Sequence, residues 1–320
     1  MKTMPSRVLI TGAAGFIGSY IVDFLLGEGC EVIGIDNFVL GRRENLSEAF
    51  KNDRFELLDV DLADMAAARE ALSKYSPESI DFVWHMAASS DISAGIADPD
   101  VDLQNTYMTT FNMLAFMHEL AIPKLAFASS SAVYGDRGDI LEEDSGPLFP
   151  ISNYGAMKLA SEASISAAVE TFLERAWIFR FPNVIGRRST HGVIYDFVNK
   201  LRSNSAELNV LGDGTQCKGY LHVSELLNAM IYVVDNAASK LNYFNIGNPD
   251  SGATVKFIAE EVVNAMASKA AIVYGHGNKG WVGDVPNVRY SIDKLQALGW
   301  KPTLSSEDAV RRAVVEQIAG

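Results

Sequence analysis

Short apolar runs alternate with longer helical patterns along the first half of the chain. The runs that predict strands cover residues 7–10, 31–35, 55–58, 81–85 and 124–128, and the main helical patterns cover about 15–27 and 103–120. These strand runs are apolar throughout rather than alternating, which is typical of strands covered on both faces. Because strands separated by helices pair in parallel through right-handed crossovers, the pattern predicts an α/β fold with a doubly wound parallel sheet.

The pattern changes after the middle of the chain. A long helix is predicted over 154–172 and a strand over 176–181, but beyond Asn183 the short elements are broken by glycine-rich stretches. This predicts a main domain over residues 1–183 and a smaller C-terminal lobe over 184–320, with some elements of the lobe returning to the main sheet.

Composition narrows the class of protein. Apolar residues make up 48% of the 320, enough for a sizeable core, and the net charge of -13 repels phosphate backbones, so no nucleic-acid partner is expected. The apolar N-terminal stretch is interrupted by glycines and Asp23, so neither a signal peptide nor a membrane span is predicted. Two cysteines without a CxxC pair and five histidines without ligand spacing predict no metal site and a reducing, cytoplasmic location.

The first predicted strand runs directly into a glycine-rich turn, TGAAGFIG at 11–18. Gly12 permits a tight turn, Gly15 lets the backbone approach a pyrophosphate, and Gly18 lets the following helix pack closely on the strand. The helix N-terminus then offers free N–H groups and a partial positive charge to phosphates. An ordinary glycine turn is the alternative, but the strand–turn–helix context favours dinucleotide binding.

Asp36 closes the second predicted strand. A carboxylate there accepts hydrogen bonds from the ribose hydroxyls of the adenosine and repels a 2′-phosphate, so NAD is expected rather than NADP. A solvated strand-end aspartate is the alternative, and Arg42 and Arg43 weaken the preference. After the third strand, Asp59 or Asp61 is a candidate for holding the adenine amino group, although a helix N-cap explains Asp61 equally well.

Three segments are candidates for the chemistry. The serine run 129–131 directly follows the fifth strand, and the carboxyl ends of such strands bind ligands in a doubly wound sheet. Tyr154 and Lys158 are one helical turn apart and point the same way. An ammonium near a phenol favours the phenolate and lowers its pKa from about 10, which would make Tyr154 a usable base. Asn183 ends the sixth strand. Each segment alone has an ordinary structural interpretation; their order behind a dinucleotide fingerprint favours a catalytic site.

With these motifs together, the sequence resembles the extended short-chain dehydrogenase/reductase family, and within it the NAD-dependent nucleotide-sugar 4-epimerases. The resemblance covers nearly the whole chain and is carried by TGAAGFIGS (11–19), DN…GRRENL (36–46), DVDL (59–62), HMAA (85–88), SSSAVYG (129–135), YGAMK (154–158), RFPNVIG (180–186), GDGT…YLHV (212–223), NIGN (245–248), GDV (283–285) and LGWKP (298–302). It implies an NAD-binding Rossmann domain over 1–183 and a mainly substrate-binding lobe over 184–320.

The resemblance also implies roles for single residues. Tyr154 would be the catalytic base, Lys158 would orient the ribose and activate Tyr154, and the Ser130 hydroxyl would bond the sugar O4. The implied cofactor-binding residues are Gly12, Gly15, Phe16, Ile17, Asp36, Asn37, Asp59, Val60, Ala87, Tyr154 and Lys158, and the implied substrate-binding residues are Ser130, Asn183, Lys218 and Asp284.

The implied reaction is epimerisation at C4 of a nucleoside-diphosphate sugar. Tyr154 would take the 4-OH proton while hydride passes to NAD⁺, and hydride would return to the opposite face of a transient 4-keto sugar. Ser131 and Ala132 stand where the 4,6-dehydratases place an Asp-Glu pair, which argues against dehydration. A decarboxylase, a dehydratase or a reductase on the same scaffold, and a non-catalytic NAD-binding scaffold or sensor, remain as alternatives.

Two further features bear on binding and assembly. Lys218 and Trp281 stand where the epimerases carry phosphate-binding arginines, and a lysine supplies charge without a bidentate fork. This weakens the case for an ordinary UDP-hexose binding mode. The helices at 103–120 and 154–172 resemble the pair that forms a four-helix dimer bundle in this family, so a homodimer is predicted.

Overall fold

The computed structural model describes residues 5–138, 140–266, 269–278 and 289–319. The chain divides into two compact units. The first contains Met1–Gly135, Pro147–Arg180 and Leu227–Phe244, and the second contains Asp136–Gly146, Phe181–Leu226 and Asn245–Gly320. The chain therefore crosses the division predicted at residue 183 in both directions. Residues 136–146 belong to the second unit, and residues 227–244 supply a helix and a sheet strand to the first.

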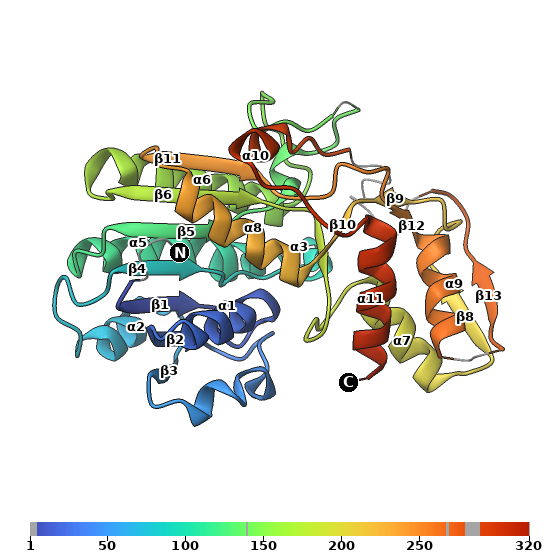
Figure 1. The fold of residues 1–320 in the computed structure, drawn as a ribbon, viewed down its shortest axis with the longest axis horizontal. Helices are drawn as coiled ribbons and strands as arrows, with labels where there is room; N and C mark the ends of the chain where they lie inside the picture. The colour runs from blue at the N-terminus through green and yellow to red at the C-terminus, as the bar shows by residue number, and fades with distance from the viewer. Residues whose placement is uncertain (1–4, 139, 267–268, 279–288, 320) are drawn as a thin grey trace. The chain divides into compact units, whose positions relative to one another are not determined.

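A seven-stranded sheet forms the centre of the first unit (Figure 1). Its strands are β1 (Arg7–Thr11), β2 (Glu31–Asp36), β3 (Phe55–Asp59), β4 (Phe82–His85), β5 (Lys124–Ala128), β6 (Arg175–Arg180) and β11 (Leu241–Asn245). Their order is β11-β6-β5-β4-β1-β2-β3, with parallel pairing of β1 to β2 and β4, of β2 to β3, of β4 to β5 and of β5 to β6. The predicted doubly wound sheet is confirmed. Its strand order reverses between β1 and β4, where such sheets bind ligands.

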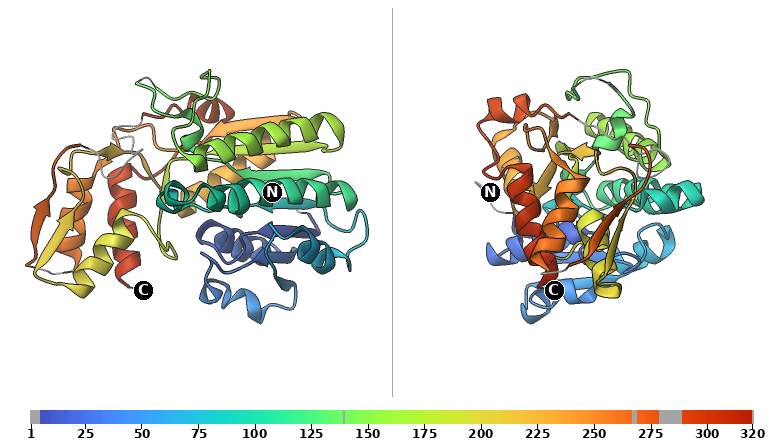
Figure 2. Two further views of the ribbon diagram at one scale, coloured as in Figure 1. Left: turned by 180° about the vertical axis from the view of Figure 1, so that it is seen from behind. Right: turned by 90° about the vertical axis from the view of Figure 1, so that its right-hand side faces the viewer.

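Helices cover both faces of this sheet (Figures 1 and 2). The helices α1 (Phe16–Gly27) and α8 (Val223–Asn236) lie on one face, and α5 (Thr109–Glu119) and α6 (Asn153–Thr171) lie on the other. The helix α2 (Met65–Leu72) shares a buried apolar cluster with α5 and α6. Burial on both faces explains why the strand sequences read as continuous apolar runs.

The helix predicted over 103–120 begins earlier and is interrupted. It consists of α4 (Pro99–Asp102), the π-helical turn η3 (Leu103–Met108) and α5, and it follows the short helix α3 (Ile92–Ala97). The Asp98 side chain accepts from the N–H of Asp100, and Pro99 occupies the first turn, so these residues form a helix start. The prediction missed it because the sequence before 103 lacks the apolar period of the later turns.

Shorter elements complete the first unit. The 3-10 turns η1 (Arg43–Leu46) and η2 (Ala49–Lys51) connect β2 to β3, and η4 (Ser131–Tyr134) follows β5. The helix predicted over 154–172 is α6, and the strand predicted over 176–181 is β6.

Three two-stranded ribbons and four helices make up the second unit in the described part of the chain. The ribbons pair β7 (Asn183–Ile185) with β10 (Tyr220–His222), β9 (Cys217–Lys218) with β12 (Ala253–Thr254), and β8 (Glu207–Val210) with β13 (Ala271–Tyr274). The helices are α7 (Val193–Ser203), α9 (Val255–Ala265), α10 (Asp293–Leu298) and α11 (Ser306–Ile318). An apolar core joins α7, α9 and α11. Among the described residues, none of the helices has the length and hydropathy that crossing a bilayer requires.

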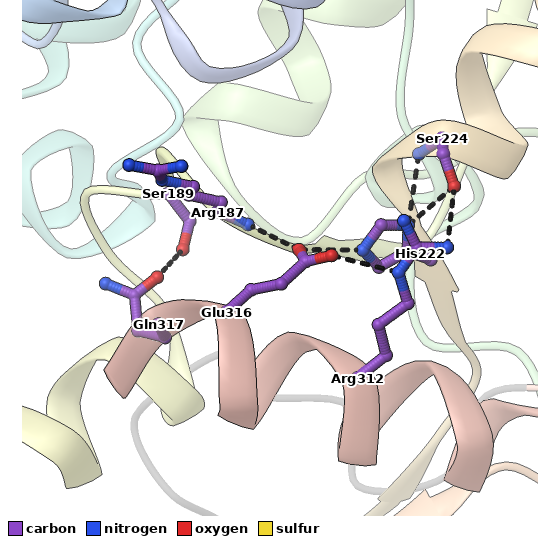
Figure 3. Close-up of polar contacts among 7 residues, drawn as sticks. All are labelled: Arg187, Ser189, His222, Ser224, Arg312, Glu316 and Gln317. Atoms are coloured by element: carbon purple, nitrogen blue, oxygen red, sulfur yellow. Dashed lines mark hydrogen bonds and ion pairs between the residues drawn. The ribbon is translucent and has the colours of Figure 1, made fainter. Parts of the chain in front are cut away.

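A buried histidine links β10 to α11 in the second unit (Figure 3). His222 Nε2 lies 3.0 Å from Glu316 Oε2, and His222 Nδ1 lies 2.7 Å from Ser224 Oγ and 3.2 Å from the Ser224 backbone nitrogen. Because a carboxylate only accepts, Nε2 carries the proton and Nδ1 accepts from Ser224. Burial lowers the pKa of His222. A neutral imidazole therefore satisfies every contact, and the contact with Glu316 is a hydrogen bond rather than an ion pair near neutral pH.

Acidification is expected to destabilise the fold through this histidine. The folded-state pKa of His222 lies below its usual value of 6.5, so the unfolded chain takes up the proton first and the free energy of unfolding falls below about pH 6.5. Glu316 adds to this fall below its usual value of 4.5; burial opposes its charge, but hydrogen bonds from His222 and Arg312 lower its pKa overall. The variant His222→Gln is expected to lower the free energy of unfolding by about 1–2 kcal/mol at neutral pH. It should also remove the fall in stability that begins below about pH 6.5.

Urea unfolding near neutral pH and about two units lower measures this difference. The variant His118→Gln is the matched control, because His118 is exposed on α5. It should keep the wild-type loss of stability on acidification. If His222→Gln also kept that loss, a different group would be responsible.

Candidate functional site

The glycine turn after β1 lies at the point where the strand order reverses. Gly12 has φ +66°, and a Cβ on it would lie 2.8 Å from the backbone nitrogen of Ala87, which follows β4. A Cβ on Gly15 would lie 3.1 Å from the Gly12 carbonyl oxygen, and one on Gly18 only 2.0 Å from it. The turn itself therefore requires Gly12. The close approach of the Gly12 carbonyl requires Gly15, and the packing of α1 on β1 requires Gly18.

The helix that starts after this turn has a free N-terminus. Gly15 is the N-cap of α1 and makes no side-chain cap bond, and the first turn, which contains Phe16 and Ile17, has no acidic side chain. In contrast, Asp64 caps α2 and Ser152 caps α6 through their side chains. Uncapped N–H groups beside a glycine cradle that a Cβ would fill fit a pyrophosphate. The residues present thus fit a dinucleotide.

Asp36 lies at the carboxyl end of β2, as predicted from its place in the sequence. Its Oδ2 accepts from the Ala14 N–H at 2.8 Å, and its Oδ1 accepts from the Phe38 N–H at 2.8 Å. Burial raises the pKa of this carboxyl, while these N–H donors act against that effect. Asn37 follows it, and its Oδ1 accepts from the Val39 N–H at 3.2 Å. The carboxylate is therefore held by the loop with lone pairs left for a ribose.

The neighbouring strand end brings the predicted adenine-side residues beside Asp36. Asp59 pairs in register with Asp36, and the Val60 N–H donates to the Asp36 carbonyl at 3.2 Å. Asp61 is not the N-cap of α2: its side chain accepts from the Ala63 N–H in a local turn, and the cap is Asp64. The turn delays the helix start, which the sequence pattern alone did not reveal.

The predicted chemical residues Ser130, Tyr154 and Lys158 come together at the carboxyl end of β5. The Ser130 hydroxyl faces the Tyr154 phenol and accepts from the Ala132 N–H at 3.2 Å. A Cβ on Gly155 would lie 2.5 Å from the Ala132 carbonyl oxygen, so this glycine lets the start of α6 approach the turn η4. Lys158 is 2% exposed, and its Nζ lies 5.9 Å from the centre of the Tyr154 ring.

The expectation that Lys158 lowers the pKa of Tyr154 is wrong for the chain by itself. Desolvation raises the pKa of Tyr154 to about 12, against the lowering effect of the facing Ser130 hydroxyl, although part of the tyrosine reaches solvent. Burial also lowers the pKa of Lys158 to about 7. Its ammonium donates to the Ala128 carbonyl at 2.6 Å rather than to the phenol. Desolvation is therefore the main cause of the pKa shift in both groups.

Two charged features beside this site, a buried ion pair and a buried carboxyl, were not predicted. Glu162 is the next residue in the helical register of Tyr154 and Lys158, and it forms a buried ion pair with Arg180. The spacing of four residues could have indicated Glu162, whereas only the sheet places Arg180 opposite it.

The second unpredicted group is the carboxyl of Asp102, which is 1% exposed. Its oxygens have no hydrogen bond of normal geometry among the described residues, although the Tyr154 N–H faces them. Burial, and then the charge of Asp91, raise the pKa of Asp102 to about 6. A charge on Asp102 in turn raises the pKa of Tyr154. No sequence signal marked this residue.

His85, at the end of β4, has a structural environment. Its Nδ1 lies 2.7 Å from Thr11 Oγ1, and its Nε2 lies 3.1 Å from Thr110 Oγ1. Burial lowers its pKa to about 3, with a further contribution from Lys158. Thr11 Oγ1 also accepts from the Ala87 N–H at 3.1 Å, so the neutral ring helps to hold the backbone beside the glycine turn.

The predicted substrate residues outside the first unit lie on ribbons of the second. Asn183 begins β7, and its Nδ2 donates to the Gly219 carbonyl at 3.5 Å, directly after Lys218. Lys218 lies in β9, opposite Ala253. Asp284 and Trp281 lie outside the described residues. In the described part of the chain, no three His, Cys, Asp or Glu side chains gather in a way that could hold a metal ion.

The glycine turn and the Ser–Tyr–Lys group stand at the same edge of one sheet, and together they define a dinucleotide-dependent enzyme. The chain belongs to the NAD dependent epimerase/dehydratase family, whose model matches residues 8–247. NAD is accordingly its cofactor. The family, the fold class and the cofactor predicted from the sequence are confirmed.

Solved structures and relatives of this kind match along nearly the full length of the chain. A crystal structure of a UDP-galactose 4-epimerase is 34% identical with a TM-score of 0.84, covering 97% of this chain and 98% of that one. The UDP-glucose 4-epimerase of Thermus thermophilus in complex with NAD is 28% identical with a TM-score of 0.84, covering 97% and 98%. UDP-glucuronic acid decarboxylase 1 of Arabidopsis thaliana is 30% identical in an alignment of 324 positions that covers 96% of this chain and 69% of the relative.

Replacing Asp36 is expected to weaken NAD binding and to reduce the preference over NADP. The variant Asp36→Asn removes the negative charge that would bond the ribose hydroxyls, and losing charged hydrogen bonds costs about 1.5–3 kcal/mol, or roughly 10- to 100-fold in Kd. NADP is expected to lose less, because its 2′-phosphate no longer meets a carboxylate. Calorimetric titration with each dinucleotide measures the ratio. Asp53→Asn, an exposed turn aspartate, is the charge-matched control; an unchanged ratio in Asp36→Asn would contradict this role.

Proposed function

We propose that this protein is an NAD-dependent epimerase acting at C4 of a nucleoside-diphosphate sugar through a transient 4-keto sugar. The observation that carries the proposal is that the Ser130 hydroxyl faces the Tyr154 phenol, with Lys158 one helical turn away. A hydroxyl and a phenol that face each other can address the same sugar oxygen. The similarity to two 4-epimerase structures across the whole chain supports this choice.

The residues of the chain divide the work of such a reaction. Gly12, Gly15 and the first turn of α1 would hold the pyrophosphate, and Asp36 would hold the adenosine ribose. When bound, NAD⁺ supplies a hydride acceptor and a positive ring next to the acid–base group. Tyr154 as phenolate would take the proton of the 4-hydroxyl and later return it, while the Ser130 hydroxyl would orient the sugar oxygen.

The protonation states explain why the site needs its ligands. In the chain by itself Lys158 has a pKa of about 7 and Tyr154 one of about 12, so the lysine would lose its proton before the phenol on raising the pH. Ionisation of Tyr154 near neutral pH therefore requires added positive charge. A bound oxidised dinucleotide provides that charge, which couples the base to the presence of the oxidant.

A decarboxylase of the same scaffold is the second candidate. The similarity to UDP-glucuronic acid decarboxylase 1 of Arabidopsis thaliana favours it, since loss of a carboxylate from a 4-keto uronic acid needs no further acid–base pair. Dehydration is less well supported, because Ser131 and Ala132 follow Ser130 in the turn η4 where an elimination would need an acid and a base.

Incubation of the purified protein with UDP-hexoses and UDP-uronic acids, followed by NMR of the C4 configuration, tests the proposal. An epimerase gives the C4 epimer with no net change in NADH absorbance. A pentose product with release of CO₂ would identify the decarboxylase instead. A folded, NAD-bound protein that turned over none of these sugars would overturn both.

We also propose a cytoplasmic homodimer. Leu103 in η3 and Phe111 in α5 are 39% and 48% exposed on the helices implied for dimer contact. Apolar side chains exposed on one helical stretch support a helix-to-helix interface. Sedimentation equilibrium tests it, since a monomeric mass at micromolar concentration would exclude the dimer.

A further inference from the structure

One face of α6 meets three consecutive residues at the end of β5. The Lys158 ammonium donates to the Ala128 carbonyl at 2.6 Å. The Ser129 hydroxyl donates to Glu162 Oε1 at 2.5 Å. The hydroxyl of Ser130, the proposed O4 ligand, faces the Tyr154 phenol at the start of this face of the helix. Lys158 and Glu162 thus each hold one residue at the end of β5 by a hydrogen bond, and the phenol one turn before them faces the third.

Arg180, at the end of β6, completes this arrangement. Its Nε and Nη2 donate to the Glu162 carboxylate at 2.9 Å and 2.6 Å, and its Nη1 donates to the Tyr134 hydroxyl at 3.0 Å. Tyr134 ends the turn η4 that follows Ser130. Glu162 and Arg180 are each 6% exposed. The ion pair therefore holds the serine turn at both ends, through Ser129 before it and Tyr134 after it.

Stability alone is a weak explanation for a buried ion pair at this place. Removing two charges from water costs several kcal/mol per ion, so apolar side chains of similar volume often stabilise a fold equally well or better. A pair with bidentate geometry instead fixes direction, because the planar guanidinium and the carboxylate allow one arrangement. Its contacts go to the two ends of the turn that holds Ser130.

The charge of Glu162 also acts on Lys158. Burial lowers the pKa of Lys158 to about 7, and the Glu162 carboxylate one turn away acts in the opposite direction. The other groups that face this part of the site are His85 on β4, which burial keeps neutral, and Asp102 and Tyr154 near the start of α6. Arg180 neutralises part of the Glu162 charge and also contacts the rings of Tyr134 and, on β11, Tyr243.

We propose that the buried Glu162–Arg180 pair is a positioning device for the Ser130, Tyr154 and Lys158 site. Through Ser129 and Tyr134 it orients the turn that presents Ser130 to the phenol. Through the charge of Glu162 it favours the protonated form of Lys158, against the effect of burial. The inference that this serves catalysis rests on the proposed function, whereas the effect on Lys158 is a property of the folded chain.

The charge effect is tested by titrating Lys158 in protein labelled with ¹³C at the lysine ε carbon. The resonance is assigned by its absence in Lys158→Met. In Glu162→Gln the titration midpoint of Lys158 is expected to move to lower pH, since the uncharged amide no longer favours the ammonium. The matched control Glu170→Gln, an exposed glutamate on the same helix, is expected to leave the midpoint unchanged. An unchanged midpoint in folded Glu162→Gln would overturn the proposed effect on Lys158. This measurement needs no sugar substrate.

The effect on the reaction is tested by the pH profile of turnover. Glu162→Gln is expected to lower kcat about 10- to 100-fold with a smaller change in KM, because misplacing a reacting group costs about this much. The alkaline limb of the profile should shift to lower pH with the Lys158 midpoint, which a purely structural role would not produce. Arg180→Lys should lose part of kcat without the shift, because the Glu162 charge remains.

A double variant separates positioning from folding. Glu162→Leu with Arg180→Met removes both charges together, so it is expected to keep a cooperative unfolding transition close to wild type while kcat stays at least about 10-fold low. A double variant with wild-type kcat and an unshifted profile would overturn the positioning role. If the wild type itself turned over no nucleotide sugar, the proposed function would fail, while the lysine titration would still decide the effect on Lys158.

Discussion

Replacing Tyr154 by Phe is expected to lower kcat about 10²- to 10⁴-fold while leaving the fold and bound NAD in place. The variant removes the phenol oxygen that would accept the 4-hydroxyl proton and keeps the ring that packs near Lys158. Because the cofactor contacts proposed for the glycine turn and Asp36 lie elsewhere on the sheet edge, NAD content should remain close to wild type. Turnover followed by NMR, with NAD released by denaturation and measured by absorbance, gives both quantities.

A matched control removes a phenol oxygen elsewhere in the same unit. The Tyr107 hydroxyl lies 3.3 Å from Ser164 Oγ, so Tyr107→Phe also loses one hydrogen bond. It is expected to cost about 0.5–1.5 kcal/mol of stability at most and to leave kcat within about twofold. Activity of Tyr154→Phe within about tenfold of wild type would mean that another group removes the proton.

The second large effect is expected at Gly18. In Gly18→Ala the new Cβ would lie 2.0 Å from the Gly12 carbonyl oxygen. The backbone fixes the positions of both atoms, so no rotamer change can separate them. Either α1 shifts away from β1 or the glycine turn distorts. Overpacking of this kind typically costs about 1–3 kcal/mol and occasionally more, and contact with rigid backbone places this variant at about 3 kcal/mol or above. Loss of bound NAD should accompany the loss of stability, because the same turn forms the pyrophosphate cradle.

The helix α1 also provides the control for this variant. Gly27 is its last residue, and a Cβ there would meet nothing within 4 Å. Gly27→Ala is therefore expected to raise the free energy of unfolding by about 0.5–1 kcal/mol through the lower entropy of the unfolded chain. Urea unfolding of both variants, with NAD content after purification, measures the contrast. Equal stabilities for the two would show that α1 does not depend on close packing at Gly18.

The pKa of Tyr154 shows that a spacing in the sequence does not fix the electrostatics of the residues it brings together. The i, i+4 spacing placed Tyr154 and Lys158 on one face of a helix, and the structure has them there. The sequence pattern could not give the desolvation of either group, which depends on β5, η4 and the neighbouring helices packing around them. Burial moves both pKa values away from the ionised forms, so the pair alone does not make a base at neutral pH.

The residues at strand ends were the easiest to predict. Asp36, Asp59 and Ser130 each follow an apolar run, and parallel strands bring their carboxyl ends to one edge of a sheet. Predictions of helix starts were weaker, since Asp61 forms a local turn and the cap is Asp64. A helix start depends on which side chain reaches a free N–H, and several nearby aspartates offer the same signal.

The amino-acid sequence by itself determined the doubly wound sheet, the glycine turn and the Tyr154–Lys158 spacing, because each depends on local periodicity or on a few neighbouring residues. Only the tertiary structure decided that Arg180 from β6 meets Glu162 from α6 and that Asp102 lies buried behind Tyr154. These contacts join segments far apart in the chain, and the burial that sets their charges arises only when the sheet and its helices pack together.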